Sequence, residues 1–238
     1  MRSHMDFFEI LKKNDIQKSE KFISRNNVNK EIQGQTLLYW AVHSGDLEIT
    51  KLLIDKGACI NKKDRFGRTA LTNATYFGFV DIAKLLLKNN AKIDSQCMDR
   101  AYFGWDGQVQ TDILDLFRNY GWINVYLDDL RDIPKGFTGA RNIDEAIKLI
   151  KNNTVHLLSL DHDLGVDDKG YLLPTGYDFV KYICKNGLRP ANKIYIHTDN
   201  VVGRENMYQT LLAARKRGFI DDDIEIYHYP ITNNYYSG

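Results

Sequence analysis

The first half of the chain repeats one arrangement of apolar and polar residues at a spacing of 33 positions, so that residues 34–61 can be laid over residues 67–94. Identical residues then coincide in the pairs Gly34 and Gly67, Thr36 and Thr69, Leu38 and Leu71, Ala41 and Ala74, Gly45 and Gly78, Ile49 and Ile82, and Leu53 and Leu86. In each unit, two short apolar stretches follow helical spacing and are separated by a glycine, which tolerates the left-handed backbone at a helix end. The pattern predicts a pair of short helices in each unit, stacked against the pair in the next unit.

Weaker versions of the same pattern flank these two units. Residues 5–33 contain apolar side chains at helical spacing, and residues 95–121 end in an apolar run at 113–117. We expect both segments to be degenerate units that cap the stack, which gives one helical domain over residues 5–121. The first four residues resemble a cloning remnant, so we expect the natural chain to begin at Met5.

After residue 121 the pattern changes to continuous apolar runs that alternate with amphipathic stretches. The apolar runs are 123–127, 155–160, 193–196 and 224–229, and helical spacing is found in 140–150 (after a short strand or turn), 176–186 and 203–217. Continuous apolar strands separated by helices are typical of a parallel sheet covered on both faces. We therefore predict a doubly wound, flavodoxin-like parallel sheet of five strands over residues 122–238. The whole chain is then a two-domain protein, an α-solenoid followed by an α/β domain.

The bulk composition narrows the class of protein without pointing to a ligand. The chain has 238 residues, of which 43% are hydrophobic, and its net charge of +1 indicates no general attraction to nucleic acid or membranes. Its three cysteines lie far apart and fit no disulfide or metal framework. No apolar run approaches the roughly 20 residues of a membrane-spanning helix. We therefore expect a cytoplasmic protein without disulfides.

The repeat in the first half resembles the ankyrin repeat in its period and in its G-x-T-x-L…A…G pattern, which begins at Gly34 and again at Gly67. The proline that usually follows the threonine is absent, because Leu37 and Ala70 stand there. The resemblance implies a concave surface that docks a protein partner, although a spacer that shields the second domain would have the same pattern. Ankyrin repeats often occur in proteins that intracellular bacteria and large viruses deliver into hosts, so a host cytoplasm is a second expected location.

Polar side chains gather at the predicted carboxyl ends of three strands. They are Asp128 and Asp129 after the first strand, Asp161, His162 and Asp163 after the third, and His197, Thr198, Asp199 and Asn200 after the fourth. Ligand sites in open α/β sheets lie beyond the carboxyl ends of the strands. The pattern therefore predicts one site at this edge of the sheet.

The second half resembles the receiver domain of response regulators, with an acidic pair after the first strand and Thr198 after the fourth. It lacks the receiver's lysine after the fifth strand, where Tyr229 precedes Pro230, and this argues against a phospho-switch. It is more similar to a variant, the cyclic-phosphate processing receiver domain. The likeness rests on Leu127-Asp128-Asp129, Arg131, Pro134, Leu160-Asp161-His162-Asp163-Leu164-Gly165, Thr175-Gly176-Tyr177-Asp178, Ile196-His197, Asn200 and Val202-Gly203-Arg204-Glu205-Asn206-Met207. The resemblance implies action on a cyclic phosphate of a nucleotide or of an RNA end.

Two mechanisms are open for hydrolysing such a phosphate at this site. In the first, His162 and His197 supply the base and the acid with Asp161 beside them, because imidazole has an unperturbed pKa near ~6.5. The phosphate would be bound by Arg131, Thr198, Asn200 and Arg204. In the second, Mg²⁺ or Mn²⁺ held by Asp128, Asp129 and Asp161 polarises the phosphate and generates hydroxide. We expect a cyclic phosphodiesterase-like hydrolase, and the alternative is a module that binds a nucleotide, a phosphate or a protein without turnover.

Overall fold

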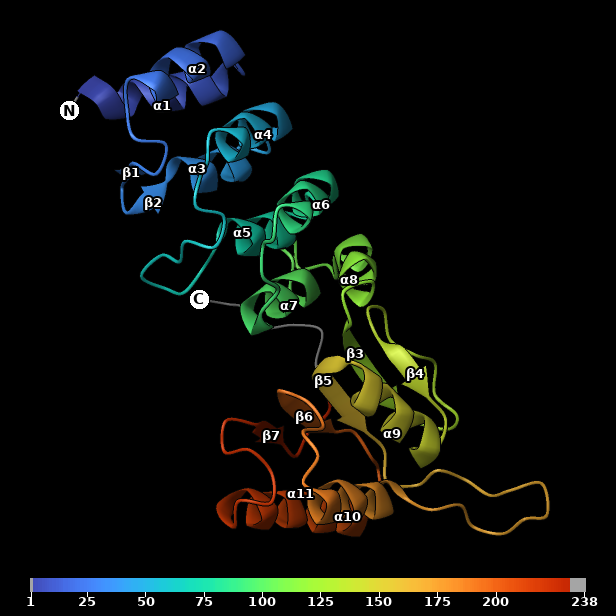
Figure 1. Ribbon diagram of the computed structural model, residues 1–238. Coiled ribbons are helices and arrows are strands. Elements are labelled where there is room, and N and C mark those ends of the chain that lie inside the picture. Colours follow the sequence, from blue (N-terminus) through green and yellow to red (C-terminus); the bar gives the residue numbers. More distant parts are fainter. Residues whose placement is uncertain (1, 232–238) are drawn as a thin grey trace. The chain divides into compact units, whose positions relative to one another are not determined.

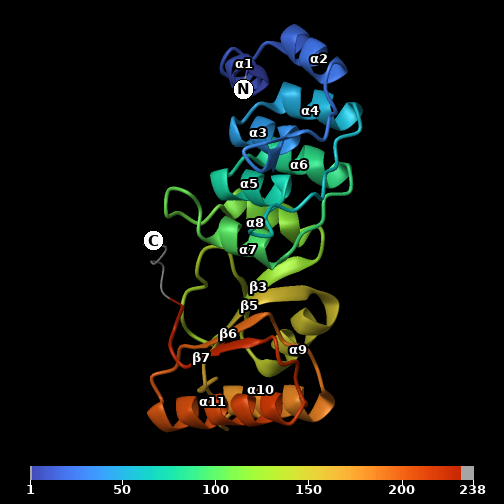
Figure 2. The same ribbon diagram turned by 90° about the vertical axis from the view of Figure 1, so that its left-hand side faces the viewer.

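The computed structural model describes residues 2–231, which divide into two compact units between Leu116 and Phe117 (Figures 1 and 2). The first unit is a series of short helices and the second is built around a parallel sheet. Among the residues described, none of the helices has the length and apolar character needed to cross a membrane.

The first unit consists of short helices, of which the first six pack in consecutive pairs. They are α1 (Arg2–Lys12), α2 (Ile16–Ser24), α3 (Leu37–His43), α4 (Leu47–Asp55), α5 (Ala70–Phe77), α6 (Val80–Lys88), α7 (Ser95–Tyr102) and α8 (Thr111–Arg118). A small antiparallel ribbon, β1 (Glu31–Ile32) and β2 (Gln35–Thr36), precedes α3. Helices α3, α5 and α7 contact one another in sequence, as do α2, α4 and α6 (Figure 1). The predicted helical repeat is confirmed. Of the segments expected as degenerate units, the first contains α1 and α2 and the second contains α7 and α8.

The repeated residues explain why each helix begins and ends where it does. The Oγ1 atoms of Thr36 and Thr69 accept hydrogen bonds from the backbone N–H groups three residues later, which caps the amino ends of α3 and α5. Gly78 ends α5 with a left-handed φ of 72°. Ala41 and Ala74 are fully buried, and their small side chains allow neighbouring helices to approach closely.

The second unit has five parallel strands in the order β4-β3-β5-β6-β7. The strands are β3 (Trp122–Leu127), β4 (Thr138–Ala140), β5 (Thr154–Leu160), β6 (Lys193–Ile196) and β7 (Glu225–Tyr227), and the helices are α9 (Ile143–Asn152), α10 (Gly176–Asn186) and α11 (Val201–Lys216). Counted along the chain, this is the order 2-1-3-4-5 of flavodoxin-like sheets. The predicted parallel α/β fold is confirmed, with a last strand shorter than the predicted run 224–229.

Alternate residues of the strands have different surroundings. Val125, Leu158 and Ile194 lie side by side across the sheet and belong to an apolar core that includes residues of all three helices. The residues next to them form a second row in register: Tyr126, Ser159, Tyr195 and Tyr227. Because side chains alternate between the two faces of a strand, this polar row lies on the face opposite the apolar core.

Candidate functional site

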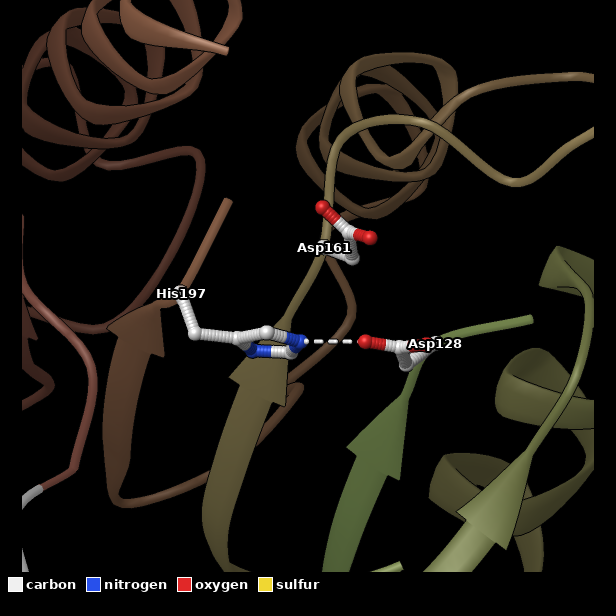
Figure 3. Close-up of side chains that lie close together, drawn as sticks. All are labelled: Asp128, Asp161 and His197. Atoms are coloured by element: carbon white, nitrogen blue, oxygen red, sulfur yellow. Dashed lines mark hydrogen bonds and ion pairs between the residues drawn. The ribbon is translucent and has the colours of Figure 1, made fainter. Parts of the chain in front are cut away.

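The sheet register brings three strand ends together at one edge. Leu127, Leu160 and Ile196 are the last residues of β3, β5 and β6, and they lie in register. The residues that follow are Asp128, Asp161 and His197. Their ligand atoms all lie within 4.8 Å of one another (Figure 3). The predicted convergence of carboxylates and an imidazole is therefore present in the fold.

Asp128 is the most completely bonded side chain of this group, and only 1% of it is exposed. Its Oδ1 accepts hydrogen bonds from the backbone N–H groups of Leu130 (2.9 Å) and Arg131 (2.6 Å). Its Oδ2 accepts from Arg131 Nη1 (2.9 Å) and contacts His197 Nε2 (3.1 Å). Burial alone would raise the pKa of Asp128, but the hydrogen bonds from Arg131 and its neighbours outweigh burial and lower this pKa. Asp128 is therefore a fixed negative charge at neutral pH.

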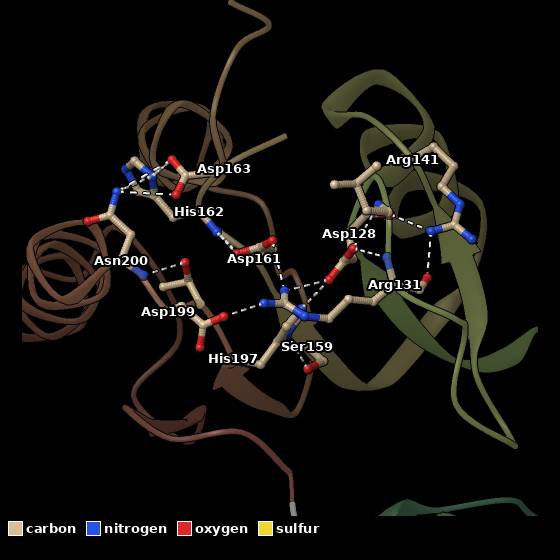
Figure 4. A network of polar contacts seen from close by, with 12 residues as sticks. Asp128, Arg131, Arg141, Ser159, Asp161, His162, Asp163, His197, Asp199 and Asn200 are labelled. Atoms are coloured by element: carbon tan, nitrogen blue, oxygen red, sulfur yellow. Dashed lines mark hydrogen bonds and ion pairs between the residues drawn. The ribbon is translucent and has the colours of Figure 1, made fainter. Parts of the chain in front are cut away.

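Arg131 places a guanidinium between the carboxylates of different strand ends. Its Nη1 donates to Asp128 and to Asp161 Oδ2 (3.0 Å), and its Nη2 donates to Asp199 Oδ2 (2.8 Å), as Figure 4 shows. The hydrogen bond to Asp128 and the nearby carboxylates raise the pKa of Arg131, so it stays charged. Its side chain is 41% exposed, whereas that of Asp199 is 96% exposed. The cation that joins the carboxylates thus comes from the protein itself and remains partly open to solvent.

His197 is held on both sides of its ring. Its Nε2 contacts Asp128, its Nδ1 lies 2.8 Å from Ser159 Oγ, and its ring stacks on Tyr126 with centroids 4.4 Å apart. Burial lowers the pKa of His197 despite the carboxylate beside it. An ionised Asp128 accepts a hydrogen bond from Nε2–H, so that Nδ1 accepts a hydrogen bond from the hydroxyl of Ser159. Both ring nitrogens of His197 are therefore hydrogen-bonded within the protein.

His162 lies in a second cluster at the amino end of α11. Its Nδ1 is 2.7 Å from Asp163 Oδ1, and the amide Nδ2 of Asn200 lies 3.3 Å from Asp163 Oδ2. The hydrogen bond with His162 lowers the pKa of Asp163. Asn200 Oδ1 also accepts from Gly203 N (2.8 Å), which caps α11. The imidazole packs so closely on Gly203 that a Cβ atom there would overlap it. His162 is therefore an imidazole oriented by a carboxylate, with 16% of its side chain exposed.

Asp161 links the two clusters. Its Oδ2 accepts from Arg131, and its Oδ1 accepts from the backbone N–H of His162 (2.7 Å). The turn that carries it depends on Gly176 at the start of α10, whose N–H donates to His162 O (2.8 Å). A Cβ atom at Gly176 would overlap the carbonyl oxygen of Asp161. Gly176 in the Thr-Gly-Tyr-Asp sequence of 175–178 is thus explained by a close approach of two backbone segments.

The remaining predicted residues lie around these clusters with different contacts. The Asp129 carboxylate is directed at Gly165, and among the described residues it does not join the group of Asp128, Asp161 and His197. Thr198 is buried, and its Oγ1 accepts from Asn200 N (3.2 Å). Arg204 lies in the first turn of α11 and is half-buried. The two histidines are not paired, because His162 contacts Asp163 and His197 contacts Asp128.

Sequence reasoning missed three residues of the site. Ser159 and Tyr126 contact His197, and Arg141 Nη1 donates to the backbone oxygens of Asp128 (2.9 Å) and Arg131 (2.8 Å). Ser159 and Tyr126 stand two positions before Asp161 and Asp128, so strand alternation could have identified them. No motif pointed to Arg141, which fixes the loop after β3.

The ligand atoms of Asp128, Asp161 and His197 could bind a divalent cation at this edge of the sheet. Two carboxylates and an imidazole form a mixed oxygen and nitrogen ligand set, which suits Mn²⁺ better than the all-oxygen set that Mg²⁺ prefers. The guanidinium of Arg131 already binds oxygen atoms of both carboxylates. Arg131 and a metal ion would therefore compete for Asp128 and Asp161.

Comparisons with known proteins give matches to both halves of the chain. Residues 123–213 match the model of the cyclic-phosphate processing receiver domain, and residues 3–97 match ankyrin repeats in three copies. A putative ankyrin repeat protein of Rickettsia bellii (strain RML369-C) is 38% identical over 68 residues, which are 29% of this chain and 38% of that protein. Protein phosphatase 1 regulatory subunit 27 of Mus musculus and of Homo sapiens is 32% identical over 112 residues, which are 46% of this chain and 68% of each relative. The chain thus spans well under half of the Rickettsia protein and about two thirds of each mammalian one.

Proposed function

Because the chain belongs to the ankyrin-repeat proteins and carries a cyclic-phosphate processing receiver domain after its repeats, we propose that its second unit hydrolyses a cyclic phosphate ester of a nucleotide or of an RNA end. One observation carries the proposal. Asp161 accepts a hydrogen bond from the partly exposed guanidinium of Arg131 and another from the backbone N–H of His162, whose imidazole is oriented by Asp163. Hydrolysis of a phosphate ester requires a positive charge that binds the phosphate and a base that takes a proton from water.

Arg131 supplies the positive charge for the phosphate. A guanidinium presents its N–H donors in a planar fork that matches phosphate oxygens. Its contact with Asp199 is a surface ion pair, which is weak and can be exchanged for another anion. The phosphate would take the position of the Asp199 carboxylate while Asp128 and Asp161 keep the guanidinium in place. Arg204 and the amino end of α11 add positive potential on the side of Asn200.

His162 acts as the general base in this scheme. Asp163 accepts a hydrogen bond from Nδ1–H, so that the unprotonated Nε2 can take a proton from water and the imidazolium formed is stabilised by the carboxylate. The water oxygen forms a bond to phosphorus, one ester P–O bond of the ring breaks, and the departing oxygen takes a proton from solvent. The product is a phosphomonoester with a free hydroxyl group. His197 keeps Asp128 in position, and the ankyrin repeats bind a protein partner.

A metal-dependent variant of this function rests on the group Asp128, Asp161 and His197. A divalent cation there would polarise the phosphate and lower the pKa of a bound water. It would have to displace Arg131 from two carboxylates. We therefore propose that Arg131, rather than a metal ion, provides the charge in the working enzyme, and that added metal competes with it.

A pair of matched arginine variants tests the proposed function. Arg189 resembles Arg131 in exposure, 41% for both side chains, and in binding more than one carboxylate. Its partners are Asp221 and Asp223, and it lies before β6 at the opposite edge of the sheet. The full chain is incubated with 2′,3′-cyclic AMP and with an oligoribonucleotide that ends in a cyclic phosphate, and products are separated by chromatography. Arg131→Lys should reduce turnover by about 10- to 100-fold, because lysine cannot form the planar fork. Arg189→Lys should match the unchanged protein.

Two outcomes would contradict the proposal. If the unchanged protein forms no more product than Arg131→Lys, no hydrolysis of these substrates depends on the site. If calorimetry shows that the cyclic nucleotide binds and stays intact, the second unit is a binding module rather than a hydrolase.

A further inference from the structure

The first unit contains a pocket that has no part in the proposed reaction. It is formed by the first helices of three successive repeats, α3, α5 and α7, which lie next to one another in Figures 1 and 2, together with the loop before α5. Its cavity volume is about 270 Å³. The lining residues are Tyr39, His43, Arg68, Thr72, Asn73, Tyr76, Phe77 and Arg100. Two of these described residues are arginines and none is acidic.

Arg68 is held in a fixed position by a buried carboxylate. Only 1% of the Asp64 side chain is exposed. It accepts hydrogen bonds from Gln35 Nε2 (2.7 Å) and from the backbone N–H groups of Phe66 (2.8 Å) and Arg68 (2.9 Å). The same carboxylate accepts from Arg68 Nε (2.8 Å). Because the loop fixes this guanidinium before any ligand arrives, binding loses less conformational entropy.

Both guanidinium groups lie over aromatic rings. Arg68 is 5.9 Å from the ring centre of Tyr39, and Arg100 is 4.6 Å from that of Tyr76. Stacking uses the face of a guanidinium, whereas its N–H donors lie in its plane and point along its edges. A carboxylate is bound at such an edge, through two parallel hydrogen bonds. Arginine and tyrosine are also the residues that dominate binding energy in protein interfaces.

The ring contacts disfavour a nucleobase as the occupant. The His43 ring is stacked on Tyr39 with a centroid distance of 6.3 Å and an angle of 8° between planes, and Arg100 covers one face of Tyr76. A base would compete with these contacts, because base recognition by aromatic residues uses their faces. The cavity also lies below the ~300–1,000 Å³ of small-molecule sites. One or two amino acid side chains are the better match.

We propose that this pocket binds an aspartate or glutamate side chain on an acidic segment of a partner protein. Arg68 and Arg100 donate to the carboxylate from two adjacent repeats, and Tyr76, Phe77 and His43 enclose the rest of the side chain. The inference goes beyond the proposed hydrolase and is independent of it, since the pocket lies wholly within the first unit.

A random dodecapeptide library displayed on phage, selected on the immobilised full chain, tests this proposal. The selected peptides should be enriched in aspartate or glutamate at one position. A synthetic copy of the most enriched peptide is then titrated with the unchanged protein, with Arg68→Lys, with Arg100→Lys and with Lys51→Ala, which removes a positive charge from the exposed side of α4. Each arginine variant should bind about 10-fold more weakly, and Lys51→Ala should bind like the unchanged protein.

Several results would overturn the proposal. They are a failure to enrich any peptide, enriched peptides without acidic residues, an affinity in both arginine variants equal to that of the unchanged protein, or displacement of the peptide by a ten-residue oligouridylate at equal concentration. Lysine keeps the positive charge in each variant, and thermal melting of each variant confirms that it is folded. The hydrolysis assay is unaffected by any of these outcomes, so the two proposals can fail separately.

Discussion

The two units use arginine in contrasting ways. In the second unit, Arg131 donates to Asp128, Asp161 and Asp199, so that carboxylates of the protein surround its charge. In the first unit, Arg100 lies over the ring of Tyr76 in a pocket without an acidic lining residue. Arg68 of the same pocket lies over Tyr39 and also donates to the buried carboxylate of Asp64. The comparison separates the two proposals, in which Arg131 binds a phosphate at a reaction site and the pocket binds a carboxylate of a partner protein.

Replacing Arg131 and Arg100 in separate variants is the strongest test of whether the two sites act independently. Arg131→Gln should lower turnover of a cyclic nucleotide by about 100-fold, because it removes the charge that faces the phosphate. It should leave the affinity for a selected acidic peptide unchanged. Arg100→Gln should weaken the binding of the acidic peptide and leave the turnover of the cyclic nucleotide unchanged. Turnover and peptide titration are measured on each variant, and a variant that changes both activities to the same extent would show that the two sites are not separate.

Two buried aspartates, which bind Arg68 in the first unit and Arg131 in the second, sharpen the comparison. Asp64 and Asp128 are each 1% exposed, and each accepts hydrogen bonds from backbone N–H groups and from an arginine three or four positions later. Replacing either by asparagine should lower the free energy of unfolding by about 2 kcal/mol, because hydrogen bonds to a charged group are lost. Urea unfolding measures this loss. Asp223→Asn, at an exposed ion pair, should change stability by less than ~1 kcal/mol, and an equal loss there would contradict the account.

Acid should destabilise the second unit through His197. Burial lowers its pKa in the folded state, so between that value and the unfolded value of about 6.5 the unfolded chain binds more protons. Stability therefore rises with pH across this window and falls as the pH is lowered below about 6.5. Asp128, whose pKa is also lowered, extends the loss to more acidic pH. Melting temperatures from pH 8 to pH 5 should show the decline, and His197→Gln should flatten it, whereas an identical slope in that variant would exclude His197 as its source.

Removing or adding a divalent metal ion should have the smallest effect on turnover. Because Arg131 already provides positive charge at the carboxylates, turnover should persist in EDTA, and added Mn²⁺ should not increase it. In Arg131→Gln, which frees the two carboxylates from the guanidinium, Mn²⁺ should bind more tightly by calorimetry. Loss of turnover in EDTA, restored by Mn²⁺, would instead favour the metal-dependent mechanism.

The fold and the convergence of the site could be predicted because each depends on a short-range pattern. The 33-residue repeat indicated the helix pairs, and the apolar runs indicated strands whose carboxyl ends meet. Asp161 and His197 lie together for this reason alone: the register aligns Leu160 with Ile196.

The pairing of side chains within the site could not be predicted in the same way. Two aspartates follow β3, and only the loop geometry decides that Asp128 faces the cluster while Asp129 faces Gly165. The two histidines looked equivalent, yet His162 meets the adjacent Asp163 and His197 meets Asp128 from another strand. Arg131 was expected at a phosphate, and its contacts with three carboxylates depend on tertiary structure that no local pattern encodes.

Phosphorus NMR of a 2′,3′-cyclic nucleotide, followed in the presence of the full chain and EDTA, tests the central claim most directly. The account predicts that the resonance of the cyclic diester is replaced by that of a phosphomonoester, and that His162→Asn slows this conversion by about 100-fold or more while the variant remains folded. An unchanged resonance with the natural sequence, or equal conversion by His162→Asn, would contradict it.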